Sequence, residues 1–266
     1  MKFIIAVVAL STFQCILGNV IPFPETILEG TEYGDKVQGD LILTAEQFDA
    51  MYNNSTKAGK TGLLSSSYRW PKNSAGYVQV PYTFRASSGF TQSEKNVIIS
   101  GMQEIQKYTC VRFIQRTSQA DYVEIINDSG CWSYLGRRGG KQSLSLMRNV
   151  NGYGCVWKAT AMHELIHALG YTHMQNRFDR DSYVKVYLEN VTPDARHNFD
   201  KVNPSYYGNF NTAYDLNSIM HYGRKSFSSN GRDVIVPYDG SKINVIGQAQ
   251  KLSSGDIARI KNMYQC

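Results

Sequence analysis

One stretch of eleven residues brings three imidazoles and one carboxylate together at helical spacing, and it constrains this chain more than any other feature. It reads His-Glu-Leu-Ile-His-Ala-Leu-Gly-Tyr-Thr-His and begins at His163. On a helix, His163 and His167 lie one turn apart on the same face, so both rings can point at one ion. Glu164 lies beside them and is free to hold a water. Gly170 can end the helix in a left-handed conformation, which turns the chain so that His173 returns as a third ligand.

This donor set predicts one Zn²⁺ per chain. Three neutral imidazoles leave one position of a tetrahedral zinc ion open, which is typical of a catalytic site rather than a structural one. Such an ion activates a water and polarises a substrate carbonyl. Glu164 is then expected to act as the general base on that water. The sequence therefore predicts an enzyme that hydrolyses peptide bonds in proteins.

The helix that carries the motif is expected over residues 158–169, and its polar residues form a single stripe. After Lys158 the polar positions are Thr160, His163, Glu164 and His167, and all others are Ala, Met, Leu or Ile. A helix that is apolar except for one stripe is buried, with the stripe facing an internal site. Core histidines held by hydrogen bonds alone are the alternative, but three unpaired polar rings converging in a core would be costly.

A second stretch, Ser218-Ile-Met-His-Tyr222, is expected near the metal. Met220 is interpreted as an apolar floor under the ligands, for which ordinary core packing is the alternative. Tyr222 is expected to ligate zinc at rest or to stabilise the oxyanion of the transition state. A structural hydroxyl is the alternative for this tyrosine. His197 and His221 are not at ligand spacing and are interpreted as structural or surface groups.

The N-terminus and the cysteines indicate an exported protein. Residues 1–18 have one positive charge and a short apolar run, as in a secretory signal peptide. Removal of Cys15 leaves four cysteines, which predicts two disulfides with three possible pairings. We therefore expect a secreted, extracellular glycoprotein. Its sequons begin at Asn127 and Asn190 in the later part of the chain and at Asn53 and Asn54 in the earlier part.

The charge is divided unevenly along the 266 residues. Residues 1–60 hold four lysines and seven acids, whereas the remainder carries a formal charge of +9. An acidic first part ahead of a basic body is expected to dock onto it. The body has no basic cluster beyond Arg137-Arg138, so we expect no nucleic-acid partner. No later stretch is long and apolar enough for a membrane span, and we expect a monomer without a membrane partner.

The remaining pattern predicts the other elements. Alternating apolar residues predict a strand over residues 77–84, at a sheet edge because of Pro81. Thr91-Gln-Ser-Glu94 is a capping box that begins a helix to Tyr108, with Tyr108 on its buried face. Further elements are strands over 111–114 and 122–126, a glycine-rich loop over 130–141, irregular chain after the histidine motif and a terminal helix over 254–264.

Together, the zinc motif, Arg177-Phe-Asp-Arg-Asp181 and the Ser218–Tyr222 stretch resemble the astacin family of metzincin proteases. The resemblance covers roughly residues 68–266 and includes the ending Tyr264-Gln-Cys266. It implies an α+β, two-lobed domain with a mixed sheet and the active-site helix in an upper lobe. The lower lobe would be irregular, with a C-terminal helix. The implied roles are zinc binding by His163, His167 and His173, general base for Glu164, transition-state stabilisation for Tyr222, salt bridges for residues 177–181, and the disulfides Cys110–Cys266 and Cys131–Cys155.

The resemblance also implies a zymogen. Family propeptides carry a Phe-x-Gly-Asp motif whose aspartate binds the zinc, and Val37-Gln-Gly-Asp40 lies at that place. Asp40 is therefore expected to silence the precursor. The implied domains are a loosely ordered propeptide over 19–60 and a catalytic domain over 61–266, separated by a trypsin-like protease that cuts after Lys60. Met174 departs from the family glutamate that anchors the new N-terminus.

A second hypothesis comes from another class of protein. A secreted protein can keep this scaffold and act only by binding. Such a protein would be expected to lose the general base or a zinc ligand. This chain retains Glu164 and all three histidines of the motif. The sequence therefore favours a zinc endopeptidase acting on protein or peptide substrates.

Overall fold

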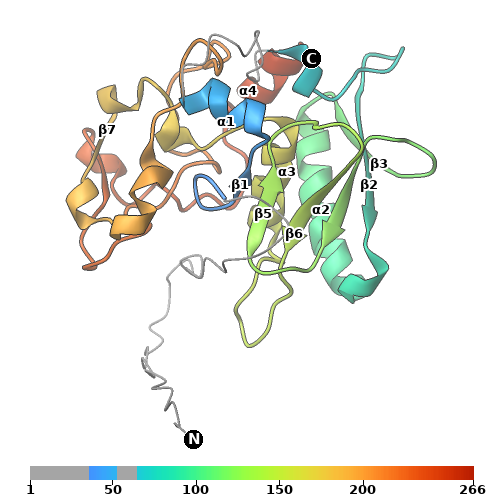
Figure 1. The fold of residues 1–266 in the computed structure, drawn as a ribbon, viewed down its shortest axis with the longest axis horizontal. Helices are drawn as coiled ribbons and strands as arrows, with labels where there is room; N and C mark the ends of the chain where they lie inside the picture. Colours follow the sequence, from blue (N-terminus) through green and yellow to red (C-terminus); the bar gives the residue numbers. More distant parts are fainter. Residues whose placement is uncertain (1–35, 53–64) are drawn as a thin grey trace, which may run out of the picture.

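The structure is a computed structural model, and it describes residues 36–52 and 65–266. The predicted signal peptide, the predicted cut after Lys60, and the sequons at Asn53 and Asn54 lie outside the described residues. Figure 1 shows a half built from the main sheet and two long helices beside a half with little regular structure. The short segment over residues 36–52, here called the leader segment, lies between the two halves (Figure 1).

The main sheet has six strands in the order β1-β5-β6-β4-β2-β3. Its strands are β1 (Leu41–Ile42), β2 (Val78–Phe84), β3 (Val111–Gln115), β4 (Tyr122–Ile126), β5 (Cys131–Tyr134) and β6 (Lys141–Leu146). All neighbouring pairs are parallel except β5 and β6, which are antiparallel. The sheet is therefore mixed, as the resemblance implied.

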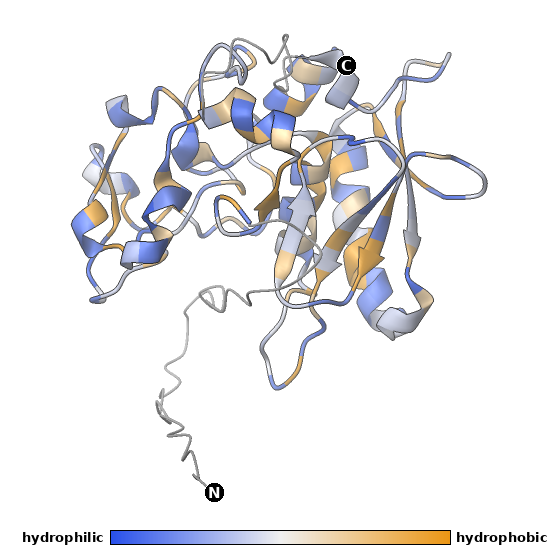
Figure 2. Ribbon diagram, in the orientation of Figure 1, coloured by the Kyte–Doolittle hydropathy of each residue, from blue (hydrophilic) through white to orange (hydrophobic). Residues whose placement is uncertain are grey.

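Helices α2 (Gln92–Tyr108) and α3 (Lys158–Leu169) pack against each other and against the strands. α2 begins at the predicted capping box, in which Thr91 and Glu94 satisfy each other's backbone N–H groups. Its buried residues are Ile98, Gly101, Met102 and Ile105. Tyr108 was predicted on the buried face but is 40% exposed, because it is the last residue of the helix. Figure 2 shows apolar residues along the strands and helices of this half.

The predicted edge position of the strand around Pro81 is wrong, since β2 lies between β3 and β4. Proline removes a backbone donor, so an interior strand tolerates it only where no ladder bond is needed. The pairing of β2 with β4 begins at Tyr82, one residue after Pro81. Along β3, Pro81 is paired in register with Ile114. The proline therefore lies just before the second ladder begins.

Two further expectations are corrected by the sheet. Residues 130–141 were predicted as a loop, but Cys131–Tyr134 form β5, and only residues 135–140 connect it to β6. Residues 19–60 were expected to be loosely ordered, but in the described part of that stretch, residues 36–52, β1 pairs with β5, and α1 (Ala45–Tyr52) follows it. Long-range pairing orders this segment despite its weak local pattern, and Leu41 and Met51 are buried.

The second half of the molecule is irregular after residue 173, as predicted. It contains one two-stranded sheet, formed by β7 (Val184–Val186) and β8 (Ile235–Pro237). The terminal helix α4 (Ser254–Tyr264) has the predicted bounds. Short 3₁₀ helices are found at Ser66–Tyr68, Ala86–Ser88, Met174–Asn176, Arg180–Ser182, Leu188–Asn190, Pro193–Phe199 and Gly240–Lys242. None of the helices within residues 36–52 and 65–266 is long and apolar enough to cross a bilayer.

Two disulfides tie the structure together. Cys110, just before β3, is bonded to Cys266 at the C-terminus, and Cys131 of β5 is bonded to Cys155 before α3. This is the pairing that the resemblance implied. The Cys131–Cys155 bond links β5, which pairs with β1 of the leader segment, to the residues just before α3.

Candidate active site

Helix α3 carries three polar residues of the motif, His163, Glu164 and His167, and all three are buried. Gly170 follows the helix with a φ of +112°, in the left-handed region that a side chain would disfavour. Its N–H donates to the carbonyl of His167, 2.8 Å away, which closes the helix end. The chain then reverses and brings His173 back beside the helix. The structure therefore unites His163, His167 and His173 in the way the spacing predicted.

The three rings all aim Nε2 at one point. The Nε2 atom of His163 lies 3.1 Å from Nε2 of His167 and 3.1 Å from Nε2 of His173. On the other side of each ring, Nδ1 of His163 lies 2.8 Å from the carbonyl oxygen of Ile219, and Nδ1 of His167 lies 2.5 Å from that of Tyr171. A carbonyl only accepts, so these Nδ1 atoms carry the proton. Each Nε2 then presents a lone pair, and lone pairs this close require a cation between them.

The fourth corner of the site comes from the leader segment. Oδ1 of Asp40 lies 3.5 Å from Nε2 of His167 and 3.3 Å from that of His173, and Oδ2 of the same carboxylate lies 3.2 Å from Nε2 of His163. All four ligand atoms lie within 4.8 Å of one another and are buried. Zinc bound tetrahedrally at about 2.0–2.1 Å separates its ligand atoms by about 3.3–3.4 Å. The distances therefore fit a tetrahedral zinc ion with three nitrogen ligands and one oxygen ligand.

A tight turn places Asp40 there. Val37 and Leu41 exchange backbone hydrogen bonds of 2.9 and 3.0 Å across this turn. Gly39 has a φ of +81° within it, and a Cβ atom on this residue would lie 2.9 Å from Cζ of Phe227. Only glycine combines this backbone conformation with such a close approach.

Glu164 lies at the site without a partner among the described residues. Its side chain is completely buried, and neither carboxylate oxygen has a hydrogen-bond donor in residues 36–52 and 65–266. Burial, and then the negative charge of Asp40, raise the pKa of this carboxyl well above its usual value. A buried carboxylate without a partner is costly, so its position calls for a polar group or water at the site. Glu164 is adjacent to the metal ligands, as a general base requires.

Tyr222 lies against the third histidine, with its ring centroid 4.5 Å from that of His173. Its hydroxyl donates to the carbonyl oxygen of Gln38 in the leader segment. Its backbone N–H donates to Oε1 of Gln175, 3.0 Å away. Burial, and then the charge of Asp40, raise the pKa of the Tyr222 phenol, so the hydroxyl remains a donor at neutral pH. Tyr222 thus lies at the site, and its hydroxyl is hydrogen-bonded to the leader segment.

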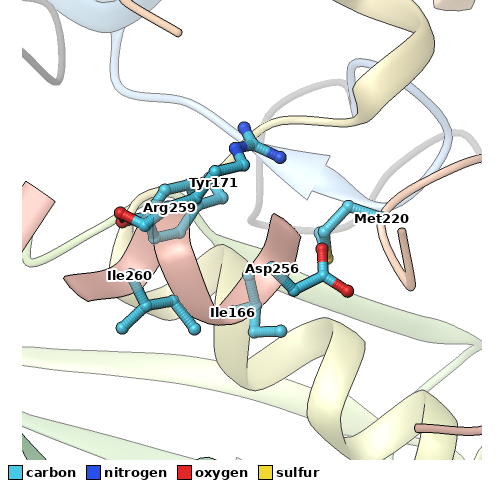
Figure 3. Close-up of a pocket in the computed structure, with 6 residues that line it drawn as sticks. All are labelled: Ile166, Tyr171, Met220, Asp256, Arg259 and Ile260. Atoms are coloured by element: carbon cyan, nitrogen blue, oxygen red, sulfur yellow. Dashed lines mark hydrogen bonds between the residues drawn. The ribbon is translucent and has the colours of Figure 1, made fainter. Parts of the chain in front are cut away.

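Met220 is fully buried in the main core, and a buried carboxylate supports the segment around it. Figure 3 shows Asp256 of α4 next to Met220 and close to Ile166 of α3. The Asp256 carboxylate accepts from the Ser218 hydroxyl at 2.5 Å and from the Ile219 N–H at 3.0 Å. The carbonyl of the same Ile219 faces His163. The segment is therefore held from α4 on one side and contacts a zinc ligand on the other.

Residues 174–181 connect the histidine motif to the irregular half. Met174, the departure from the resemblance, is buried, and its N–H donates to the Met220 carbonyl at 2.8 Å. The Arg177 guanidinium is buried and pairs with Asp179 at 2.7 Å. Asp181 pairs with Arg180 and Lys201. These are salt bridges of the kind that the resemblance implied.

The two other histidines lie apart from the metal ligands. His197 is exposed, whereas His221 is buried with Nε2 at 2.9 Å from the Tyr214 hydroxyl. Burial lowers the pKa of His221 to about 4, so it is neutral at physiological pH. Both were interpreted as structural or surface groups, and neither is part of the cluster of potential ligands within the described residues.

Sequence reasoning missed three groups that contact the site or its ligands. Gln38 places Oε1 at 3.2 Å from Nδ1 of His173, which gives the third ring its outer partner. Asn198 accepts from the Gly39 N–H at 3.0 Å, and Asp256 supports the Ile219 peptide. Gln38 lies inside the Val37–Asp40 stretch, and Asp256 is the capping-box partner of Ser253. Asn198 has no local signal, and both Asn198 and Asp256 reach the site through tertiary contacts that no spacing in the sequence shows.

Comparison with known proteins agrees with this geometry. A family model described as Astacin, a peptidase family, matches residues 65–265. High choriolytic enzyme 1 of Oryzias latipes is 43% identical over 203 residues, which are 76% of this chain and 72% of that protein. Zinc metalloproteinase nas-4 of Caenorhabditis elegans is 36% identical over 235 residues, which are 88% of this chain and 70% of that protein.

A solved structure supports the same assignment. High choriolytic enzyme 1, described as a hatching enzyme zinc-protease from medaka, matches with a TM-score of 0.70 at 42% identity. The match covers 76% of this chain and 96% of that chain. The expected α+β fold, the three-histidine zinc site and the peptidase activity are thereby confirmed. The chain belongs to the astacin family of zinc metalloendopeptidases.

Proposed function

We propose that the chain is made as a latent precursor, in which the leader segment closes the zinc site and must be removed by cleavage. The observation that carries this proposal is the Asp40 carboxylate at the fourth corner of the three-histidine site. A zinc ion with four protein ligands has no open position for a water or a substrate. The full-length chain is therefore expected to be silent, and is here called the uncut chain.

The leader segment also blocks the residues that would act on a substrate. The main-chain carbonyl of Gln38 accepts the hydrogen bond of the Tyr222 hydroxyl, and Asp40 places a second negative charge near Glu164. Both residues become available when the segment leaves. The zinc ion, when bound, supplies a Lewis acid that lowers the pKa of a water and polarises a carbonyl.

Two side chains then carry out proton transfer and charge stabilisation. Glu164 takes the proton of the attacking water on its carboxylate and delivers it to the departing amine. Departure of Asp40 removes one of the two causes that raise the pKa of the Glu164 carboxyl, so its ionised form, which can accept a proton, becomes less unfavourable. The Tyr222 hydroxyl donates to the oxygen of the scissile carbonyl as negative charge develops there. Met220, which is fully buried in the main core, is proposed as the apolar floor under the ligand rings.

We also propose a boundary and a location for the protein. Residues 1–18 are assigned as a signal peptide, residues 19–60 as the propeptide and residues 61–266 as the catalytic domain. The activating cut is assigned to a trypsin-like protease acting after Lys60. Two disulfides favour an oxidising, extracellular environment. The protein is proposed to act there as a monomer on protein substrates.

The experiment compares the uncut chain with an Asp40→Ala variant on a quenched fluorescent peptide, without any activating protease. The wild-type uncut chain is expected to be silent and the variant active, because the fourth ligand is gone. Glu46→Ala is the matched control, since it removes an exposed acid of the same segment and should leave the chain silent. A zinc-loaded Asp40→Ala chain that stays silent until it is cut would contradict the proposal.

The boundary is tested separately. Wild-type chain is treated with trypsin until activity appears, and the active product is sequenced from its N-terminus. The expected first residue is Thr61. An active product that begins far from residue 61 would overturn the assigned boundary while leaving the role of Asp40 untouched.

A further inference from the structure

Asn198 contacts the leader segment at the residue next to the metal-facing carboxylate. It lies in the 3₁₀ helix Pro193–Phe199 of the irregular half and is only 4% exposed. Its side-chain oxygen Oδ1 accepts from the backbone N–H of Gly39 at 3.0 Å. A backbone N–H can only donate, so this contact fixes which end of the carboxamide faces the segment.

The contact lies close to the reacting centre. Gly39 directly precedes Asp40, whose carboxylate lies 3.2–3.5 Å from the three Nε2 atoms. The peptide group that Asn198 holds is therefore one residue away from the fourth corner of the zinc site. A substrate bound with its scissile carbonyl at that corner would pass its own backbone through the same region.

A chain of amides holds Asn198 in place independently of the leader segment. The Asn198 main-chain carbonyl accepts from Nδ2 of Asn176 at 2.8 Å. Oδ1 of Asn176 accepts from Nε2 of Gln175 at 2.9 Å, and Oε1 of Gln175 accepts from the Tyr222 N–H. All four residues are buried. The Asn198 backbone therefore belongs to the same hydrogen-bonded unit as the proposed oxyanion donor, which fixes the place from which its carboxamide extends.

Departure of the leader segment would remove the one donor that Oδ1 of Asn198 has among the described residues. A buried acceptor that loses its donor is unfavourable, so the site favours a new N–H at this position. Every non-proline residue of a peptide substrate supplies such a group. Main-chain recognition of this kind is independent of the substrate side chain.

We propose that Asn198 is a substrate-binding residue, whose carboxamide oxygen accepts a backbone N–H of the peptide substrate next to the scissile bond. The inference rests on the proposed function, because it requires the leader segment to leave. In the uncut chain the Gly39 N–H occupies the place of that substrate group. Asn198 then aligns the substrate main chain against the unit that carries Tyr222.

The test is a double-mutant cycle between the protein and the substrate. Wild-type and Asn198→Ala chains are activated with trypsin, and kcat/KM is measured for a peptide and for analogues with a single N-methylated amide at each position flanking the scissile bond. N-methylation removes one N–H at a time. At one position it is expected to lower kcat/KM of the wild type about tenfold more than that of the variant. If Asn198→Ala and N-methylation lower kcat/KM independently of each other at every position, the proposal is wrong.

Control variants separate this effect from general damage. His197→Ala changes the exposed neighbour on the same 3₁₀ helix and should show the wild-type response to every analogue. Asn198→Asp keeps an acceptor oxygen and should retain the coupling. If Asn198→Ala does not fold, judged by zinc content and thermal unfolding, Asn198→Leu has a similar shape without an acceptor and takes its place. Failure of the proposed latency would appear separately, as activity of the wild-type uncut chain.

Discussion

Replacing Gly39 by alanine tests how the leader segment is held in the site. The residue has a φ of +81°, and left-handed backbone costs a non-glycine residue about 1–2 kcal/mol. The added Cβ would lie 2.9 Å from Cζ of Phe227 and 3.0 Å from the Tyr222 hydroxyl. Both neighbours are rings packed in the irregular half, and such overpacking costs about 1–3 kcal/mol. The bound segment is therefore destabilised by about 2–5 kcal/mol.

This cost applies only while the segment occupies the site. Since about 1.4 kcal/mol corresponds to a factor of ten, the fraction of uncut chain with an open site should rise about 30-fold or more. Initial rates of peptide hydrolysis by zinc-loaded uncut chain, without protease, measure that fraction. After trypsin activation, Gly39→Ala and wild type should have equal kcat/KM, because residue 39 is no longer attached.

Gly76→Ala is the matched control for this experiment. Gly76 also has a φ of +81°, but no atom lies within 4 Å of the place its Cβ would take. This variant should lose about 1–2 kcal/mol of stability and remain silent when uncut. A Gly39→Ala uncut chain as silent as wild type, with its zinc in place, would refute the reasoning that this close approach sustains latency.

Three further outcomes are expected. Glu164→Gln should lower kcat of the activated chain about 10²–10⁴-fold while zinc content stays at one per chain, and a smaller loss would exclude the general-base role. Tyr222→Phe should lower kcat by up to about 10²–10³-fold with little change in KM, and a change in KM alone would favour a purely structural hydroxyl. Burial lowers the pKa of His221 to about 4 in the folded chain, against 6.5 unfolded. Its contribution of about 3 kcal/mol is fully present above pH 6.5 and is lost as the pH falls towards 4, because the unfolded chain then takes up the proton. The free energy of unfolding measured between about pH 7.5 and 5 should fall less steeply in His221→Asn, and equal slopes would contradict this.

The motif helix could be predicted from sequence because its signals are local. The spacing of His163 and His167 fixes a shared face, and Gly170 allows the reversal that returns His173. The capping box at Thr91 fixes the start of α2 in the same way, and the structure shows a second one, Ser253 with Asp256, at the start of α4. Such patterns depend on neighbours within one or two turns, so no tertiary information is needed.

The sheet could be predicted only in part, since its order depends on distant partners. β5 reads Cys-Trp-Ser-Tyr between glycine-rich turns and is too short to show a clear alternation. Its strand conformation comes from pairing with β6 on one side and β1 on the other. β1 itself has two residues, and its pairing with β5 together with the turn contacts between Val37 and Leu41 orders it. Pro81 indicated an edge, but the offset start of β4 accommodates it inside the sheet.

The zinc ligands followed from the sequence, whereas their supports did not. Asp256 reaches Ile219 from 37 residues away, and Asn198 reaches Gly39 from 159 residues away. Neither residue lies in a motif with metal-ligand spacing. Groups that position a ligand or bind a main chain need only one oxygen in the right place, and many residues can supply it. Geometry alone identifies them.

A crystal structure of the uncut chain, with diffraction data collected on both sides of the zinc absorption edge, would show whether Asp40 completes the zinc site. We expect one anomalous peak, about 2.0–2.1 Å from Nε2 of His163, His167 and His173 and about 2.0–2.2 Å from a carboxylate oxygen of Asp40. Glu164 should lie beside the peak without ligating it. No zinc at the three rings, or zinc bound there with a water in place of Asp40, would show that Asp40 does not close the site.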